Sequence, residues 1–174
     1  MVSFNTPSDL RRVLKLDAGN EYYTDTELQE FLDKANESLY NEIKRKFEYQ
    51  KCRVKTDEKG NTLNRFQFVL GPVSAVQEVR REDTVIASGN YTLNADLNLL
   101  EFNANVLEVG DVVEIWYLPL VYTEAELYIA AYHILSTTNV AKPSRTSTNI
   151  EDIKLLKDDY LHTINSRMMV TGWF

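Results

Sequence analysis

The stretch from Phe66 to Leu118 places the strongest constraint on the fold, because short alternating runs follow one another there. Val113, Ile115 and Tyr117 would share one face of such a run. Period-two alternation of β-branched and aromatic residues is typical of half-buried strands. Turn residues separate the runs at positions 82–83, 88–90, 94–96 and 110–111. Because helical periodicity flanks this stretch on both sides, the sequence predicts an α+β protein: a helical bundle of about four helices with an inserted small antiparallel β-sheet.

Two helices are expected before the strands. Thr6 can cap a short helix that begins with Pro7. The pattern from Thr24 to Glu27 is a capping box, and apolar residues then recur at helical spacing as far as Phe47. The longest predicted helix therefore spans about 25–47.

Two more helices are expected after the strands. The pattern from Thr123 to Glu126 is read as a second capping box, which predicts a strongly apolar helix over about 124–137. A polar linker over 136–147 precedes a last helix that begins near Thr148. The helices over 25–47 and 124–137 are expected to pack together. Their predicted core residues are Phe31, Leu39, Leu127, Ala131 and Ile134.

The segment from Lys51 to Leu70 is predicted to form a polar hairpin that projects from the sheet. Val76 and Val79 are out of register with simple alternation, which predicts a β-bulge. One structural domain with an insertion is expected. Its parts are an N-terminal helical part over 1–48, the antiparallel β subdomain over 49–120, and a C-terminal helical part and tail over 121–174.

Composition excludes several classes of protein. The net charge of −7 argues against a protein that wraps nucleic acid over its whole surface. A single cysteine, Cys52, cannot form a disulfide within one chain. No apolar run approaches the ~20 residues that a membrane span needs, and the N-terminus lacks a signal-peptide pattern. We expect a soluble protein made in a reducing cytoplasm, with no membrane partner.

No constellation of residues points to catalysis. His133 and His162 each lack a second metal ligand one helical turn away, and the glycines form no phosphate-binding loop. The acids Glu124 and Glu126 are explained by the predicted capping box. We therefore expect no enzymatic activity, no cofactor and no metal.

Two stretches remain that could contact a partner. A basic cluster interleaved with aromatic residues runs over 44–55, and it fits either a phosphate backbone or a solvated helix end followed by a hairpin. Nearby acids such as Glu48 and Asp57 dilute the cluster and favour the second interpretation. The chain also ends in apolar residues, including Trp173 and Phe174, which either fold back on the core or dock on a partner.

The order of these parts resembles that of a known family. The segments that carry the resemblance are DLRRVL, TDTELQEFLDKANESLYNEI, GPVSAVQEVRRED, NYTLNADLNLLEF and GDVVEIWY, in that order, followed by a helical pair. This succession is similar to the head-to-tail connector proteins of tailed bacteriophages, also called adaptor or head-completion proteins. Two departures are Leu118-Pro119-Leu120, where a glycine often follows the last strand, and the added segment from Lys51 to Leu70.

The resemblance implies a structural virion protein of the neck, with no catalytic residues. Such a subunit would form a ring, dodecameric in the family, beneath the portal vertex. The ring would join capsid to tail while genomic DNA passes through its lumen without specific binding. Portal contact is then expected from the last helix and tail, namely Arg167, Met168, Met169, Val170, Trp173 and Phe174. Contact with the neighbouring subunit or the tail is expected from Arg53, Lys55, Lys59, Asn61 and Arg65.

Two alternatives use the same helix-plus-sheet plan. One is another neck or tail-completion protein of the virion. The other is a non-viral soluble interaction module. A large closed ring, or a ring that forms on the portal, would distinguish the connector from the module.

Overall fold

A computed structural model describes residues 3–16, 23–43, 47–141 and 149–171. These residues form four α-helices, seven β-strands and a short 3-10 helix. The chain divides into two compact units. The helical unit comprises residues 1–44 and 121–174, and the β unit comprises residues 45–120. The α+β class predicted from the sequence is therefore confirmed.

Capping boxes start the first two helices, as expected. Helix α1 (Pro7–Leu14) has Thr6 as its N-cap, and Asp9 reaches back to Thr6 N at 3.0 Å. Helix α2 (Asp25–Ile43) follows Thr24, whose N–H donates to Glu27 Oε2 at 2.8 Å. The buried stripe of α2 consists of Leu28, Leu32, Ala35, Asn36, Leu39 and Ile43. The described helix ends at Ile43 and Phe47 is not helical, so the expectation of a helix to 47 is wrong at its end.

Helix α3 (Leu120–Ala141) begins directly after strand β7, without a loop. The N–H of Leu120 donates to Pro72 O at 2.8 Å. The expected helix start at Thr123 is therefore wrong, because Val121 and Tyr122 already belong to the helix. The expected end near 137 is wrong too, because the helix continues to Ala141 through the first residues of the predicted linker. Apolar residues surround α3, and its buried members include Tyr122, Ala125, Leu127, Ile129, Ala130, Ala131, Ile134 and Leu135. An all-round apolar helix is typical of a bundle centre.

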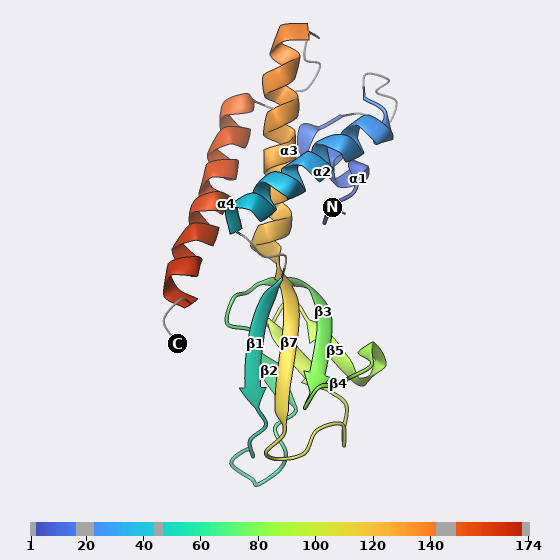
Figure 1. The fold of residues 1–174 in the computed structure, drawn as a ribbon, viewed down its shortest axis with the longest axis vertical. Coiled ribbons are helices and arrows are strands. Elements are labelled where there is room, and N and C mark those ends of the chain that lie inside the picture. The colour runs from blue at the N-terminus through green and yellow to red at the C-terminus, as the bar shows by residue number, and fades with distance from the viewer. Residues whose placement is uncertain (1–2, 17–22, 44–46, 142–148, 172–174) are drawn as a thin grey trace. The chain divides into compact units, whose positions relative to one another are not determined.

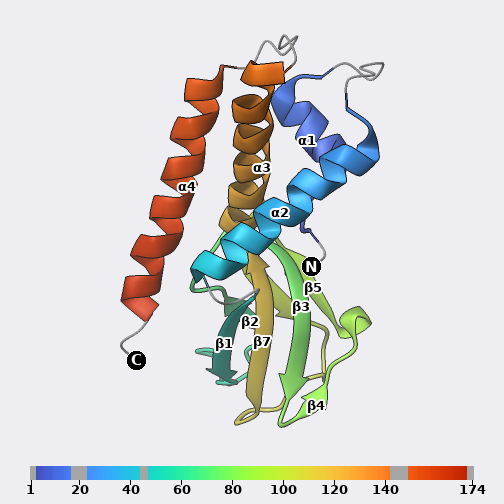
Figure 2. The same ribbon diagram turned by 45° about the horizontal axis from the view of Figure 1, so that its top comes forward.

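Helix α4 (Ile150–Thr171) lies beside α3 in the helical unit (Figures 1 and 2). The ring of Tyr160 stacks on that of Tyr128, with centroids 5.4 Å apart. One turn earlier, Lys157 Nζ lies 4.6 Å from the ring centroid of Tyr132. Ile153 and Ile164 are buried along the same face of α4. Among the described residues, no helix is long and apolar enough to cross a bilayer.

The predicted helical core is confirmed at four of its five positions. Leu39, Leu127, Ala131 and Ile134 are buried. Phe31 is only half-buried, and Lys34 Nζ lies 5.8 Å from its ring centroid. This position therefore lies at the margin of the core, where a cation can cover the aromatic face.

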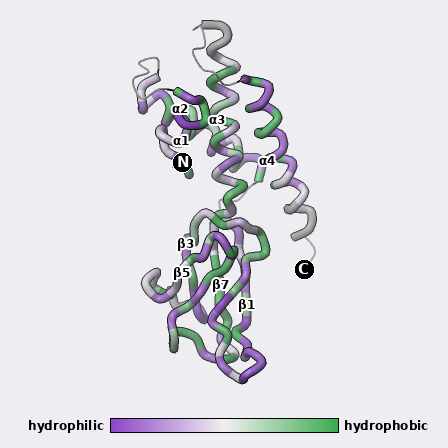
Figure 3. Tube along the Cα trace, turned by 180° about the vertical axis from the view of Figure 1, so that it is seen from behind, coloured by the Kyte–Doolittle hydropathy of each residue, from purple (hydrophilic) through white to green (hydrophobic). Residues whose placement is uncertain are grey.

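The β unit contains two antiparallel sheets. Its strands are β1 (Glu48–Arg53), β2 (Arg65–Gln67), β3 (Val73–Arg81), β4 (Thr84–Val85), β5 (Tyr91–Asn94), β6 (Leu99–Phe102) and β7 (Val112–Pro119). One sheet has the order β1-β7-β3-β4 and the other the order β2-β6-β5. Their apolar faces enclose one core, which includes Phe66, Phe68, Val79, Leu100, Phe102, Val113, Ile115 and Tyr117. Figure 3 shows green, hydrophobic positions on the strands of this unit.

The alternation read from the sequence correctly predicts which side chains of β7 face the core. Val113, Ile115 and Tyr117 are buried, whereas Glu114 and Trp116 between them are half-buried on the opposite face. Register shifts in β3 occur between Val73 and Ala75 and between Val76 and Glu78, so the predicted bulge is confirmed. These shifts leave the strand paired with β7 along its whole length.

The segment from Lys51 to Leu70 is not one hairpin, which corrects that part of the expectation. Strand β1 pairs with β7, and β2 pairs with β6 in the other sheet. The two arms meet only near the turn, where Thr56 and Thr62 form an isolated bridge. Closer to the body, the side-chain amide of Gln50 joins the arms instead. It donates to Gln67 O at 2.9 Å and accepts from Val69 N at 3.0 Å.

Candidate interaction surface

The five residues predicted to contact a neighbour or the tail all lie exposed in the β unit. Arg53 ends β1, Arg65 starts β2, and the other three occupy the turn between these strands. Arg65 Nε forms a cross-strand ion pair with Glu101 Oε1 at 3.1 Å. Arg53 and Lys55 form no ion pair with any described residue. Their contact role remains a prediction.

The turn over 57–61 is held in one conformation by Asp57. Its Oδ1 accepts from the backbone N–H groups of Lys59 and Asn61, both at 2.8 Å. The side-chain amide of Asn61 donates to Asp57 Oδ2 at 3.2 Å. Hydrogen bonding from the Asn61 backbone, followed by that from its side chain, lowers the pKa of Asp57. The turn thus presents Lys59 from an ordered loop.

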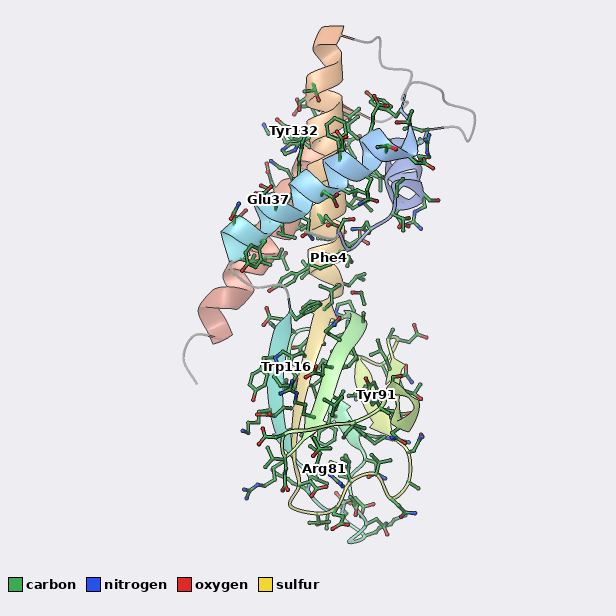
Figure 4. The ribbon with its side chains drawn as sticks, turned by 45° about the vertical axis from the view of Figure 1, so that its right-hand side comes forward. Phe4, Glu37, Arg81, Tyr91, Trp116 and Tyr132 are labelled. Carbon is green, nitrogen blue, oxygen red and sulfur yellow. The ribbon has the colours of Figure 1, made fainter. Side chains whose placement is uncertain are left out.

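Three strands of the four-stranded sheet carry an aromatic and charged outer face. Tyr49 on β1 is directly opposite Trp116 on β7, and their ring centroids are 5.1 Å apart. The guanidinium of Arg80 on β3 lies 5.3 Å from the Trp116 ring centroid. This outer face is the side of the sheet turned away from the core, and Figure 4 labels Trp116 on it.

Glu114 joins the charged groups of the outer face. Its Oε1 accepts from Tyr49 Oη at 2.7 Å and from Lys51 Nζ at 3.0 Å. These hydrogen bonds, that from Tyr49 first, lower the pKa of Glu114. Burial, reinforced by the hydrogen bond to Glu114, raises the pKa of Tyr49 to about 12. Tyr49 is nevertheless 48% exposed, so its ring is available to a partner.

The residues predicted to bind the portal are only partly within the described structure. Arg167, Met168, Met169 and Val170 belong to the backbone of α4. Trp173 and Phe174 lie outside the described residues. The portal-binding role of this segment remains a prediction.

A buried polar cluster in the helical unit was missed from the sequence. Glu126 on α3 is fully buried and accepts from Phe4 N at 2.9 Å, Asn5 N at 3.0 Å and Asn36 Nδ2 at 2.8 Å. Through these hydrogen bonds, Glu126 connects the segment before α1 and the middle of α2 to α3. Figure 4 labels Phe4 in this region. Burial raises the pKa of Glu126, while the donors, Phe4 N first, oppose that shift. The donors to Glu126 are all amides, so the cluster connects three segments of the helical unit.

A groove of about 430 Å³ lies among α1, α3 and α4 in the helical unit. Its apolar lining includes Val13, Leu127, Ile153 and Leu156. Charges of both signs, such as Arg12 and Glu124, also line it. This mixture gives no preference for one class of ligand.

The histidines and the cysteine are possible ligands or nucleophiles among the described residues. Within the described part of the chain, no three His, Cys, Asp or Glu side chains are grouped as metal ligands. Burial, together with Lys157 and Lys34, lowers the pKa of His133. Burial raises the pKa of the Cys52 thiol, which disfavours the reactive thiolate.

The fold and its exposed sheet face define an α+β protein with a candidate surface for protein contacts. No protein-family model matches the chain, and no curated protein matches it. Seven chains of solved structures do match. One is described as the neck of an empty GTA particle computed with C6 symmetry; it is 15% identical, with 88% of this chain and 87% of that chain covered and a TM-score of 0.31. At this identity and TM-score, the likeness carries no argument about the function of this chain.

Proposed function

We propose that this chain is a structural subunit of the head-to-tail connector of a tailed bacteriophage. Copies of it would form a ring beneath the portal vertex and join the capsid to the tail in the neck of the virion. Genomic DNA would pass through the lumen of the ring. The subunit would act without a cofactor and catalyse no reaction.

One observation carries the proposal, and it is the arrangement of the two units along the chain. The helical unit is assembled from residues before and after the β unit, which is inserted between α2 and α3. This is the order of parts through which the sequence resembles the connector family. A subunit of this plan offers a helical body and a separate β module for different contacts.

The outer face of the β unit suits a protein contact. It brings Tyr49, Trp116 and Arg80 together on paired strands. Tyrosine, tryptophan and arginine are the residue types that contribute most to binding at protein interfaces. Because antiparallel strands fix their positions, these side chains would be ordered before a partner arrives, which lowers the entropic cost of binding.

The charge of the chain suits a channel wall. A net charge of −7 repels the phosphate backbone on average, so a duplex could slide through without being held. We infer that acids outnumber bases on the wall that faces DNA. Tight binding of duplex DNA by the isolated protein, with a steep salt dependence, would contradict this inference.

The test uses the purified chain and the portal protein of the same genome. The two are mixed and examined by native mass spectrometry and negative-stain electron microscopy. We expect a closed ring of this chain on the portal, and an assembly defect when residues 56–62 are deleted. A chain that stays monomeric and shows no affinity for the portal would overturn the proposal and favour a soluble interaction module.

A further inference from the structure

Strands β1 and β4 form the two edges of the four-stranded sheet, and unpaired charges of opposite sign lie at these edges. Arg53 and Lys55 are exposed on the β1 side, and Glu82 and Asp83 are exposed at the turn into β4. None of these four has an ion pair with another described residue. Because β1 and β4 lie at opposite edges of the same sheet, the positive edge of one molecule can meet the negative edge only of another copy.

The other cations on the strands of the β unit form ion pairs within the unit. Lys51 pairs with Glu114 at 3.0 Å, and Arg65 pairs with Glu101 at 3.1 Å. Arg80 pairs with Glu78, and Arg81 pairs with Asp111 at 3.5 Å. In the turn beyond Lys55, Asp57, Glu58 and Lys59 together carry one negative charge, so residues 53–59 keep a net charge of +1. The charge left for an external partner is therefore positive at β1 and negative at β4.

The opposite charges lie at the same level along the strands. Arg53 is directly opposite Val112 on β7, and on the other side of β7 the N–H of Glu82 donates to Val112 O at 3.2 Å. A second copy displaced sideways across the sheet, past β4, would therefore bring its Arg53 to the level of the turn from β3 into β4 without sliding along the strands, and Asp83 is the acid of that turn next to β4. No change of register is needed for the charges to meet.

Strand direction also fits this contact. Strand β1 is antiparallel to β7, β7 to β3, and β3 to β4. It follows that the β1 strand of a second copy would run antiparallel to β4, as neighbours in this sheet do. Exposed apolar side chains lie at both edges, with Tyr49 at 48% and Val85 at 57% exposure. Because β4 has only two residues, few backbone hydrogen bonds could form across this contact, and the charged and apolar side chains at the two edges would supply most of it.

We propose that the β4 edge of one copy binds the β1 edge of the next copy of this chain. The contact is heterologous, because it joins two different surfaces, and repeated contacts of this type close into a ring when the rotation permits. This inference rests on the proposed ring function and assigns the contact surface between neighbouring subunits. Opposite charges at the edges select the head-to-tail order over pairing of like edges.

Cysteine cross-linking tests the contact directly. In a Cys52→Ser background, Arg53→Cys and Asp83→Cys are introduced into one chain. Within one molecule β7 and β3 lie between these positions, so their Cα atoms are roughly 10 Å apart or more, and a disulfide needs less than about 7 Å. Mild oxidation of the concentrated protein, alone and with the portal, should therefore link separate copies and give a ladder of dimers, trimers and larger species. Each single-cysteine variant is the control and should stop at the dimer.

Charge reversal provides a second measurement in the wild-type background. Arg53→Glu with Lys55→Glu should weaken self-association at low salt by more than about tenfold, as like charges meet. Glu82→Lys with Asp83→Asn should do the same, and an equal mixture of the two variants should recover assembly. Asp96→Lys, in the β5–β6 turn of the other sheet, is the matched control and should assemble normally.

The outcomes separate this inference from the proposed function. A ring on the portal with no ladder, and with no effect of the charge reversals, would overturn the edge contact and leave the connector proposal standing. A chain that neither forms a ring nor cross-links would overturn both. A ladder together with recovery in the mixture would support the edge contact.

Discussion

Asn36 on α2 donates a hydrogen bond from its side-chain amide to Glu126 Oε1 on α3 at 2.8 Å, in the buried centre of the helical unit. The same carboxylate accepts from the backbone of Phe4 and Asn5. Three segments that are distant in sequence therefore meet at one acidic side chain. A buried acceptor with several donors stabilises a fold mainly because its loss leaves those donors unsatisfied.

Replacing Glu126 with leucine should destabilise the helical unit. The N–H groups of Phe4 and Asn5 would lose their acceptor, which costs about 1–3 kcal/mol for a buried group. Urea unfolding followed by circular dichroism at 222 nm measures the change. Glu124→Leu, two residues earlier and half-buried, is the matched control and should change the free energy of unfolding much less. Equal effects of the two substitutions would show that the cluster does not hold the unit together.

Two core substitutions test the packing of α3. Leu127→Ala and Ile134→Ala each remove a buried side chain, with exposures of 2% and 1%, and should cost about 2–5 kcal/mol. Leu155→Ala on α4 removes a leucine that is 71% exposed and should stay within about 0.5 kcal/mol of wild type. Thermal melting measures all three. An unchanged melting temperature for both core variants would disprove the packing.

Gly71→Ala should destabilise the β unit through a steric clash. A Cβ at this position would lie 2.0 Å from Asn98 Nδ2, which donates to Phe68 O at 3.1 Å. Moving that amide sacrifices a hydrogen bond, so we expect a loss of about 1–3 kcal/mol. At Gly89 a Cβ would meet nothing within 4 Å, so Gly89→Ala should be nearly neutral. Chemical unfolding that cannot distinguish the two alanine variants would refute this prediction.

Tyr49 should titrate at about pH 12, and Glu114→Gln should lower its pKa. The pKa should stay above the ordinary value of 10.0, because burial is the larger cause of the shift and would remain. Since the folded protein holds this proton more tightly than the unfolded chain, stability falls as the pH rises from about 10 to about 12. Alkaline difference spectroscopy against Tyr49→Phe isolates this tyrosine. A pKa unaffected by Glu114→Gln would contradict the prediction.

Removal of residues 171–174 should abolish portal binding and leave the melting temperature of the free subunit nearly unchanged. Trp173 and Phe174 are the strongest candidate anchors in this segment, since tryptophan is a common anchor at interfaces. Pull-down with the portal and differential scanning fluorimetry give the two readouts. If the truncated subunit unfolds while its folded fraction still binds the portal, the segment belongs to the core instead.

Local patterns were enough to predict much of the fold. The capping boxes at Thr6 and Thr24 form as expected, because each needs only residues within one helical turn. The alternation around Ile115 gives the correct buried face, since side chains of a strand point to opposite sides in turn. The bulge in β3 was also visible as an interruption of this alternation.

Strand pairing and the polar cluster could not be predicted from local patterns. The partners of β1 and β2 lie in different sheets, and alternation alone does not specify which strands pair. The pattern from Thr123 to Glu126 fits a capping box, but it lies inside α3. A useful signal was present, because Glu126 falls on the stripe of Tyr122 and Ile129 and interrupts an otherwise apolar face. An acid in that position needs buried donors, and these come from Phe4 and Asn5, more than a hundred residues away in sequence.

The candidate contact surface was predicted only in part. The exposed, basic character of Arg53 and Lys55 could be read from the sequence. The grouping of Tyr49, Trp116 and Arg80 could not, because it depends on the register of β1 and β3 on either side of β7.

The Gln50 side chain acts as a substitute for one peptide unit of a strand. By donating to Gln67 O and accepting from Val69 N, it occupies one backbone acceptor and one backbone donor in and just after β2. A free chain at high concentration would benefit from having these groups occupied. Gln50→Ala would free them, and amyloid-type stacking between subunits would then have a place to begin. We therefore predict that this single amide helps to keep the free chain from aggregating.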